Sequence, residues 1–214
     1  MRRLRRRSAP VVRRTVTGNS TLVFGLHGYG SDETQLATLI PLSLPAITLV
    51  PRAPHRVEPG WGWWRPEPHD TLVDLAPAPA VAAAVDQIAA AIVEAQHVEA
   101  IGSARTVLVG YSQGAALALS VAARFPELLR CVVTGAGHLL PHERVARSPN
   151  PLDVLIMNGS LDPVVSAEAH VATELAFRDA GHAVTTRVDH VPHVIDAAQA
   201  RFADDWLRQH LGRA

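Results

Sequence analysis

Lysine is absent from this 214-residue chain, and cysteine is nearly so. The one cysteine, Cys131, cannot form a disulfide within the chain, which favours a reducing compartment, and we expect a cytoplasmic protein. The sequence also lacks an apolar run of the ~20 residues that a membrane span needs, so we expect no stable membrane association. Aromatic residues make up only 5% of the chain, whereas hydrophobic residues make up 48%, which excludes disorder throughout.

Charge is sparse and balanced over the chain as a whole. Twenty arginines face twenty acidic residues, and this zero net charge gives no electrostatic reason for nucleic-acid binding. Seven of the arginines lie within the first 14 residues, which contain no acid. We therefore expect residues 1–14 to form a flexible basic arm and residues 15–214 to form a single, acidic domain.

Short apolar runs alternate with helical patterns after this arm. The runs, each typical of a strand covered on both faces, are Thr21–Leu26, Ala46–Val50, Arg105–Val109, Cys131–Thr134, Asp153–Met157 and the weaker Thr185–Val188. One helical pattern begins near Pro79, where Val81, Val85, Ile88 and Ile92 recur at steps of four, three and four and so share one helix face. The other helical patterns cover Gln113–Arg124, Ser166–Ala180 and Asp196–His210. This alternation predicts an α/β protein with a mostly parallel central sheet flanked by helices on both faces. Residues 51–79 have no clear period and are expected to form a long irregular segment.

The strongest motif is Gly110-Tyr111-Ser112-Gln113-Gly114, which follows one predicted strand and opens a predicted helix. A serine at such a strand–turn–helix junction sits on a strained turn that exposes its hydroxyl, and the flanking glycines let strand and helix approach. The motif therefore predicts Ser112 as a catalytic nucleophile, against the alternative of a passive serine in a glycine-flanked turn.

A serine hydroxyl needs a base to remove its proton and a third group to orient that base. Asp162 follows the strand at 153–157, whereas Asp153 begins that strand and would lie at the opposite edge of the sheet. His193 lies between the last predicted strand and the last predicted helix. We therefore predict that Asp162 and His193 complete the catalytic set with Ser112.

Other histidines offer alternatives. His190 and His193 form an H-x-x-H pair that could bind a metal, but the chain supplies no further ligand pattern such as H-E-x-x-H. His138 and His142 follow the predicted strand at 131–134 and could line a pocket, and His27 is expected to brace the loop that it begins. We expect no metal and no organic cofactor.

Attack on a carbonyl also requires hydrogen-bond donors for the oxyanion. The backbone N–H of Gln113 follows the nucleophile at a helix N-terminus, where the helix dipole favours negative charge. The segment Leu26-His27-Gly28-Tyr29-Gly30 leaves an early strand and turns on two glycines, so the N–H of Tyr29 can point at the same site. The sequence therefore predicts an oxyanion hole made by Tyr29 and Gln113.

The segments LHGYGSDE, GYSQGAALAL and NGSLDPVVS, together with a late histidine followed by Val-Ile, resemble the phospholipase/carboxylesterase family of small α/β-hydrolases. This family includes acyl-protein thioesterases and bacterial serine esterases. The resemblance runs from about Thr21 to the C-terminus. It implies the α/β-hydrolase fold, and it implies the same roles for Ser112, Asp162, His193, Tyr29 and Gln113 as the residues themselves suggest. The chain is short and has no obvious lid insertion, so we expect little or no lid.

Three tryptophans, Trp61, Trp63 and Trp64, lie in the irregular segment. They could pack beneath a loop, or they could form a wall of the substrate pocket together with His138, since indole offers broad apolar contact. The family position favours a place near the site, and we carry these residues forward as substrate-binding candidates.

The combined prediction is a serine hydrolase that cleaves carboxylic esters, with short- to medium-chain acyl or lysophospholipid-like substrates, through an acyl-enzyme. A thioesterase that acts on acylated protein or acyl-CoA is the alternative within the enzymes, because esters and thioesters pass through the same intermediate. A degenerate hydrolase that serves as a binding module is the alternative outside them. The expected partner is a small-molecule substrate, and a homodimer is left open.

Overall fold

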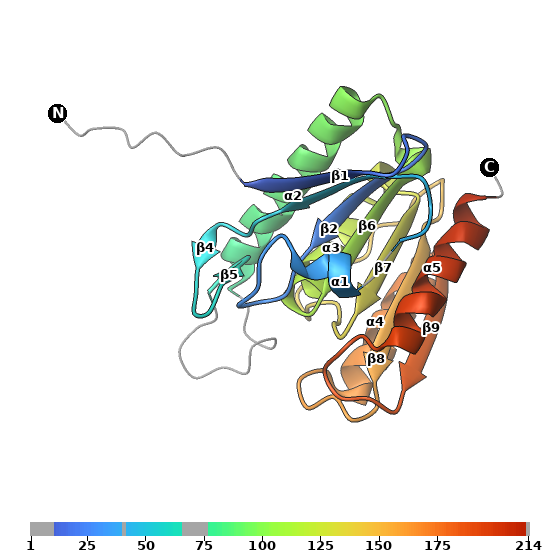
Figure 1. The fold of residues 1–214 in the computed structure, drawn as a ribbon. Coiled ribbons are helices and arrows are strands. Elements are labelled where there is room, and N and C mark those ends of the chain that lie inside the picture. The colour runs from blue at the N-terminus through green and yellow to red at the C-terminus, as the bar shows by residue number, and fades with distance from the viewer. Residues whose placement is uncertain (1–10, 40–41, 66–76, 213–214) are drawn as a thin grey trace.

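A seven-stranded sheet forms the centre of the structure, a computed structural model that describes residues 11–39, 42–65 and 77–212 (Figure 1). In sheet order the strands are β1 (Val12–Val16), β3 (Ile47–Pro51), β2 (Leu22–Leu26), β6 (Thr106–Tyr111), β7 (Cys131–Gly135), β8 (Asp153–Gly159) and β9 (Ala183–Asp189). The edge strand β1 pairs antiparallel with β3, and the other pairs are parallel. The predicted mostly parallel sheet is confirmed.

Helices cover both faces of this sheet, as predicted (Figure 1). The helices on one face are α2 (Ala78–Glu99), α3 (Gln113–Arg124) and α4 (Ala167–Asp179), and those on the other are α1 (Gln35–Leu39) and α5 (Ala197–Leu211). Short 3-10 turns at Ser103–Arg105 and Pro126–Leu128 precede β6 and β7. Central strands such as β2 and β7 are buried along their whole length, which is why their sequences are continuously apolar.

The chain begins to pair with the sheet earlier than the sequence predicted. Arg13 and Arg14, assigned above to a basic arm, lie in β1, and the Arg14 guanidinium forms two hydrogen bonds of 3.0 Å with the Glu99 carboxylate at the end of α2. All five residues of β1 are exposed, so its sequence carries no apolar pattern that would mark a strand. Residues 1–10 of the predicted arm lie outside the described residues.

The predicted irregular segment contains a small hairpin. Its strands are β4 (His55–Arg56) and β5 (Trp61–Gly62), which pair antiparallel. A bridge between Ser31 and Trp61 joins this hairpin to the loop after β2. Residues 66–76, on which the expectation of little or no lid partly rests, lie outside the described residues.

Within the described part of the chain, α2 is the one helix long and apolar enough to cross a membrane, judged by length and composition alone. Its alanine-rich sequence gives it that character although no strictly apolar run reaches the required length. Val81, Val85 and Ile92 are fully buried in the core between this helix and the sheet. The buried residues of α2 recur every three or four positions, as the spacing in the sequence predicted.

Candidate active site

Ser112 lies at the sharp turn from β6 into α3. Its φ of 53° and ψ of −120° place it in a backbone region that L-residues rarely adopt, and its N–H donates to the Gly135 carbonyl at 3.0 Å. The turn needs its glycines, since a Cβ on Gly110 would lie 2.3 Å from the Gly114 carbonyl oxygen, and one on Gly114 would lie 2.2 Å from the Leu26 oxygen. The sequence motif therefore specifies a strained, tightly packed turn.

Three side chains from distant parts of the chain form a hydrogen-bonded series at this turn. His193 Nε2 lies 2.8 Å from Ser112 Oγ, and His193 Nδ1 lies 2.8 Å from Asp162 Oδ2. A carboxylate can only accept, so Nδ1 carries the ring proton and Nε2 is left to accept the hydroxyl hydrogen of the serine. The structure thus brings together the three residues predicted to act as nucleophile, base and acid.

The Asp162 carboxylate is fully buried in the turn that follows β8. Its Oδ1 accepts hydrogen bonds from the backbone N–H groups of Val164, at 2.8 Å, and Val165, at 3.0 Å. Asp153, the competing acid, lies at the other end of β8 and pairs with Arg130 at 2.6 Å. Of the aspartate that begins β8 and the one in the turn after it, only the second is therefore near Ser112.

His193 lies in the loop between β9 and α5, and its backbone is held by a side chain from β6, which β7 and β8 separate from β9 in the sheet. The Tyr111 hydroxyl donates to the His193 carbonyl at 2.8 Å, and the two rings are tilted with their centroids 5.7 Å apart. His190 points elsewhere, since its Nδ1 lies 3.2 Å from the Ser160 hydroxyl. The H-x-x-H pair thus has separate partners, and the described residues hold no group of three or more potential metal ligands.

The two predicted oxyanion donors lie on elements that contact Ser112's turn. Gln113 is the first residue of α3, and Tyr29 lies in the loop after β2, which pairs with β6. Gly114 packs against the backbone at the end of β2, which brings this loop close to the turn. Among the described residues, neither the Tyr29 nor the Gln113 backbone N–H donates to another protein group. The role of these two amides as oxyanion donors stays a prediction.

The Gln113 side chain has a second role that the motif did not reveal. It is buried, its Oε1 accepts from the Trp63 N–H at 2.8 Å, and its Nε2 donates to the Trp64 carbonyl at 3.1 Å. The amide thereby fastens the segment after β5 to the start of α3. No sequence signal distinguishes such a glutamine from one that contributes only its backbone.

The tryptophans occupy different environments. Trp63 and Trp64 are 4% and 1% exposed and lie in the core cluster, and Trp63 Nε1 donates to the His27 carbonyl at 2.8 Å. The Trp61 ring lies under the guanidinium groups of Arg52 and Arg56, whose carbons are 5.1 and 5.6 Å from its centroid. These placements favour packing beneath a loop over a place in the wall of the substrate pocket.

His138, the fourth substrate-binding candidate, is buried in the segment that follows β7. Asn158, near the end of β8, holds this segment: its Oδ1 accepts from the Gly137 N–H at 3.0 Å, and its Nδ2 lies 2.7 Å from His170 Nδ1. A Cβ on Gly137 would lie 2.4 Å from the Ala115 side chain, so the segment packs directly on the start of α3. Asn158 begins the segment NGSLDPVVS, but nothing in that segment marked its side chain as the group that holds residue 137.

Two further residues have structural roles that the sequence suggested. His27 is fully buried and braces its loop, with Nδ1 donating to the Gly28 carbonyl at 2.8 Å and Nε2 accepting from the Ala53 N–H at 3.0 Å. Burial lowers the pKa of His27, in keeping with a neutral ring. Cys131 is buried in β7, and burial raises the pKa of its thiol to about 12, so it is a packed side chain and not a nucleophile.

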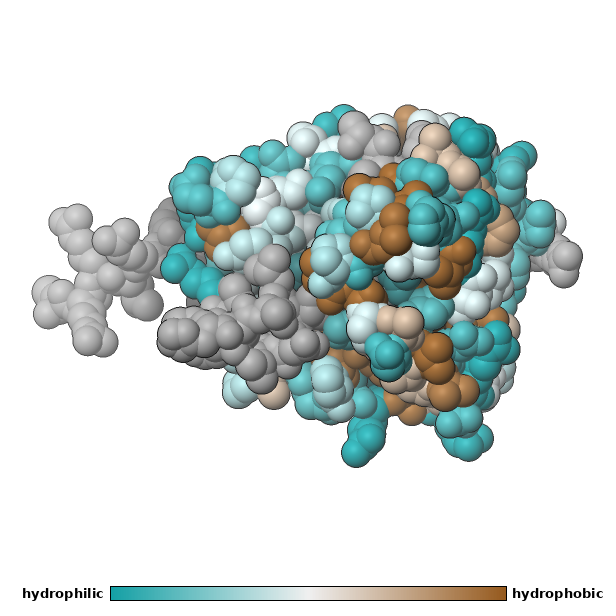
Figure 2. Space-filling model, turned by 90° about the horizontal axis from the view of Figure 1, so that it is seen from below, coloured by the Kyte–Doolittle hydropathy of each residue, from teal (hydrophilic) through white to brown (hydrophobic). Residues whose placement is uncertain are grey.

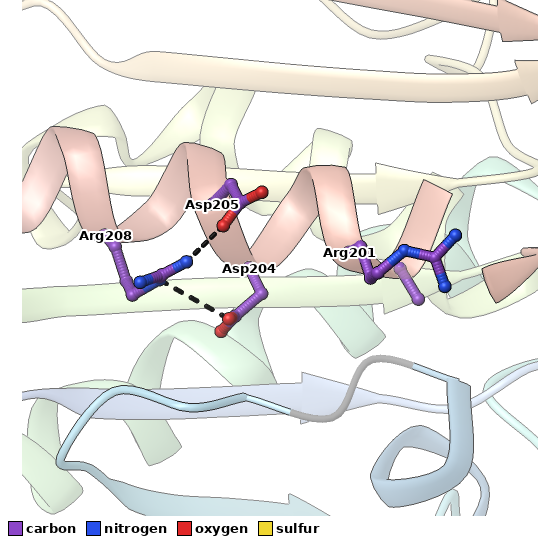
Figure 3. Close-up of a pocket in the computed structure, with 5 residues that line it drawn as sticks. Arg201, Asp204, Asp205 and Arg208 are labelled. Atoms are coloured by element: carbon purple, nitrogen blue, oxygen red, sulfur yellow. Dashed lines mark hydrogen bonds and ion pairs between the residues drawn. The ribbon is translucent and has the colours of Figure 1, made fainter. Parts of the chain in front are cut away.

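A hollow of about 240 Å³ lies elsewhere, along α5, and is lined by Ala200, Arg201, Asp204, Asp205 and Arg208 (Figure 3). Three of its four charged residues already interact with one another, since Arg208 contacts both aspartates, and Asp204 also accepts hydrogen bonds from the Ser43 backbone and hydroxyl. The hollow contains no nucleophile or base. It therefore does not compete with Ser112's turn as a site of chemistry.

The face below the carboxyl ends of the parallel strands is partly apolar, with hydrophobic residues gathered in patches among polar ones (Figure 2). Leu161 and Val194, the direct neighbours of Asp162 and His193 in the sequence, are 52% and 40% exposed. Apolar surface therefore borders the hydrogen-bonded series.

A mostly parallel sheet covered by helices on both faces, with a serine at the strained turn from β6 into α3, defines an α/β-hydrolase. The chain belongs to the phospholipase/carboxylesterase family, whose family model matches residues 7–211. The resemblance seen in the sequence is thus confirmed.

Comparison with individual proteins agrees with this assignment. Esterase YpfH of Escherichia coli strain K12 is 31% identical over 114 residues, a match that covers 53% of this chain but only about half, 48%, of that relative. The crystal structure of esterase PE8 superposes with a TM-score of 0.80 at 26% identity, covering 94% of this chain and 98% of that one. A Bacillus cereus carboxylesterase has the same fold, with a TM-score of 0.83, 19% identity and 94% of each chain covered.

Proposed function

We propose that this protein is a serine hydrolase that cleaves carboxylic esters, with short- to medium-chain acyl or lysophospholipid-like substrates, through an acyl-enzyme on Ser112. The observation that carries the proposal is the continuous series of hydrogen bonds from Ser112 Oγ through His193 to Asp162, each 2.8 Å long. Membership of the phospholipase/carboxylesterase family supports the ester as the class of substrate.

Acylation begins when His193 Nε2 removes the Ser112 proton as Oγ attacks the ester carbonyl. The imidazolium that forms is stabilised by the Asp162 carboxylate, which also fixes the ring in the tautomer with its proton on Nδ1. The negative charge that develops on the carbonyl oxygen is stabilised by hydrogen bonds that the N–H groups of Tyr29 and Gln113 donate to it. Each such donor, preorganised at its position, is worth on the order of 100-fold or more in rate.

Collapse of the tetrahedral intermediate breaks the bond to the alcohol, which takes the proton from His193 and leaves. Ser112 then carries the acyl group as an ester. A water molecule loses its proton to the same Nε2 and attacks the acyl carbonyl. When this second intermediate collapses, Ser112 regains its hydrogen and the acid departs, so the cycle needs only the residues already named.

The decisive experiment compares wild-type protein with Ser112→Ala on p-nitrophenyl esters of increasing acyl length. We expect Ser112→Ala to lower kcat by about 10⁶-fold, since the nucleophile and base act as one unit. A fluorophosphonate probe should label the wild type and not the variant. Ser120→Ala, which removes a buried hydroxyl bonded to a backbone carbonyl within α3, is the matched control and should retain activity and labelling.

Two outcomes would overturn the assignment of a serine hydrolase, and a third would change its substrate class. Wild-type turnover by Ser112→Ala would show that another residue attacks the substrate, and failure of the wild type to turn over any ester or react with the probe would favour a binding module. Acyl-CoA thioesters matched in chain length are measured beside the esters. A much higher kcat/KM on the thioesters would replace the ester by the thioester as the substrate class.

A further inference from the structure

Tyr111 lies between three parts of the site, and the catalytic scheme gives this residue no role. It is the last residue of β6 and directly precedes Ser112. Its ring is partly buried against the core cluster that contains β6, β7 and α5 residues. Its hydroxyl reaches the loop between β9 and α5, on the far side of β7 and β8 in the sheet order.

The ring of Tyr111 also lies against the loop after β2. A Cβ on Gly28 would be 3.1 Å from Cδ1 of Tyr111 and 3.3 Å from its Cε1, so the ring covers the α-carbon of this glycine. Gly28 itself is fixed by a hydrogen bond of 2.8 Å from its N–H to the Gln35 side chain. Tyr111 is therefore seated against a braced loop at one side and directs its hydroxyl at the His193 loop on the other.

Among the described residues, the hydroxyl of Tyr111 and one backbone N–H hold the backbone of that loop from outside it. The hydroxyl donates to the His193 carbonyl at 2.8 Å, while the Val191 carbonyl accepts from the Leu161 N–H at 3.1 Å. The two donors come from different parts of the chain, Tyr111 from β6 and Leu161 from the segment after β8. Burial and the nearby Asp162 charge raise the pKa of Tyr111, so the phenol keeps its proton and remains a donor.

We propose that Tyr111 is a positioning residue: its hydroxyl fixes the His193 backbone so that the imidazole stays within hydrogen-bond reach of Ser112 Oγ. The inference rests on the proposed function, in which His193 is the base. Small displacements of a base lower the rate of proton transfer steeply, whereas they leave the substrate contacts of other residues intact. Loss of the hydroxyl is therefore felt in kcat and not in KM.

Tyr111→Phe tests this, since phenylalanine keeps the ring on Gly28 and removes only the hydroxyl. We expect kcat to fall about tenfold with KM unchanged, and the rate of fluorophosphonate labelling to fall in parallel. Ser120→Ala is again the control, because it also removes a hydroxyl bonded to a backbone carbonyl but lies within α3, and it should change neither rate.

A spectroscopic readout separates positioning from general stabilisation. The Nδ1 proton of His193, hydrogen-bonded to Asp162, should give a downfield proton resonance in wild-type protein, assigned with ¹⁵N-labelled histidine. In Tyr111→Phe we expect this resonance to broaden or move upfield, because the loop samples more positions, while the melting temperature stays close to that of the wild type.

Three results would overturn the inference: an unchanged kcat, an unchanged His193 resonance, or a fall in kcat that merely accompanies a large fall in melting temperature. None of these affects the proposed function, which stands or falls with Ser112→Ala. Conversely, if Ser112→Ala retains full activity, the proposed function fails whatever Tyr111→Phe shows.

Discussion

The carboxylate of Asp162 lies 2.8 Å from Nδ1 of His193 and is closed to solvent. Its second oxygen is occupied by the N–H groups of Val164 and Val165. These two donors fix the plane of the carboxylate, so the first oxygen has one direction in which to accept. The turn after β8 thus determines the orientation of a ring that belongs to the loop after β9.

Asp162→Asn should keep this geometry but remove the charge and allow an amide N–H to face the ring. The imidazole would then be driven toward the tautomer with its proton on Nε2, which cannot accept from Ser112. By analogy with serine proteases, where the same change has been measured, we expect kcat to fall by about 10⁴-fold. Steady-state kinetics on a p-nitrophenyl ester provide the measurement.

Asp153→Asn is the matched control, since it changes the other aspartate of β8, which pairs with Arg130 at the opposite end of the strand. It should leave kcat unchanged. A comparable loss of kcat in both variants would mean that the effect comes from disturbing β8 and not from the His193 ring.

Gln113 joins the start of α3 to the segment after β5, and its loss should affect both stability and rate. In Gln113→Ala the buried Trp63 N–H and Trp64 carbonyl lose their side-chain partners, which should lower the free energy of unfolding by about 1–3 kcal/mol. The backbone N–H of residue 113 remains, but the neighbouring loops are less firmly held, and we expect kcat to fall as well. Urea denaturation and steady-state kinetics measure the two effects.

Gln96→Ala serves as the control for this variant. The Gln96 amide also joins distant segments, donating to the Thr106 hydroxyl and the Leu128 carbonyl, but it lies at the end of the sheet away from Ser112. It should cost similar stability and leave kcat intact. If both variants lost the same stability and neither lost activity, the hydrogen bonds of the Gln113 side chain would not contribute to catalysis.

The sequence predicted those features of the fold that local patterns encode. Strands β2, β6 and β7 are buried on both faces, so their apolar runs were visible, and the glycines around Ser112 marked a turn that only glycines can make. Strand β1 was not predicted because every one of its residues is exposed. It is a strand because it pairs with β3, and such long-range pairing leaves no local pattern.

The same distinction applies to the site. Ser112, Asp162 and His193 follow strands of one parallel sheet, so the rule that strand carboxyl ends share an edge was enough to group them. The side chains of Gln113 and Asn158, and the Tyr111 hydroxyl, form hydrogen bonds between segments that are far apart in the sequence. No periodic pattern in the sequence indicates these contacts. Trp63 and Trp64 are buried in the core, where their backbone binds the Gln113 side chain, and no sequence period announces these contacts, so packing and pocket-wall roles could not be separated beforehand.

The buried His27 should make stability depend on pH. Burial lowers its pKa below the ordinary value near 6.5. The hydrogen bond to the Gly28 carbonyl and the charges of Asp32 and Glu33 oppose this, and Arg52 adds to it. In the window below pH 6.5 the unfolded chain therefore binds more protons at this residue than the folded one. Its contribution to stability is complete above pH 6.5 and is lost as the pH falls toward the folded-state pKa.

We expect the free energy of unfolding to fall between pH 7 and pH 5, and His27→Gln to show a shallower fall from a lower starting value. Urea denaturation at each pH gives the comparison. His97→Gln, at an exposed position on α2, is the control and should follow the wild-type curve. A variant lacking His27 that followed the same slope as wild type would assign the pH dependence to other groups.

Gly114 and Gly102 provide the sharpest contrast between two identical substitutions. A Cβ on Gly114 would meet the carbonyl oxygens of Leu26 and His27 at 2.2 and 2.5 Å, and these are backbone atoms that cannot turn aside. Gly114→Ala must therefore push α3 away from β2, which should cost about 3 kcal/mol or more and disturb the loop that carries Tyr29.

A Cβ on Gly102 meets nothing within 4 Å, and its φ of −79° suits alanine. Gly102→Ala should leave activity unchanged and raise stability by about 0.5 kcal/mol through the unfolded chain. Urea denaturation of the two variants beside wild type measures the difference. Equal stability in both would mean that α3 and β2 can separate enough to admit the Cβ of residue 114.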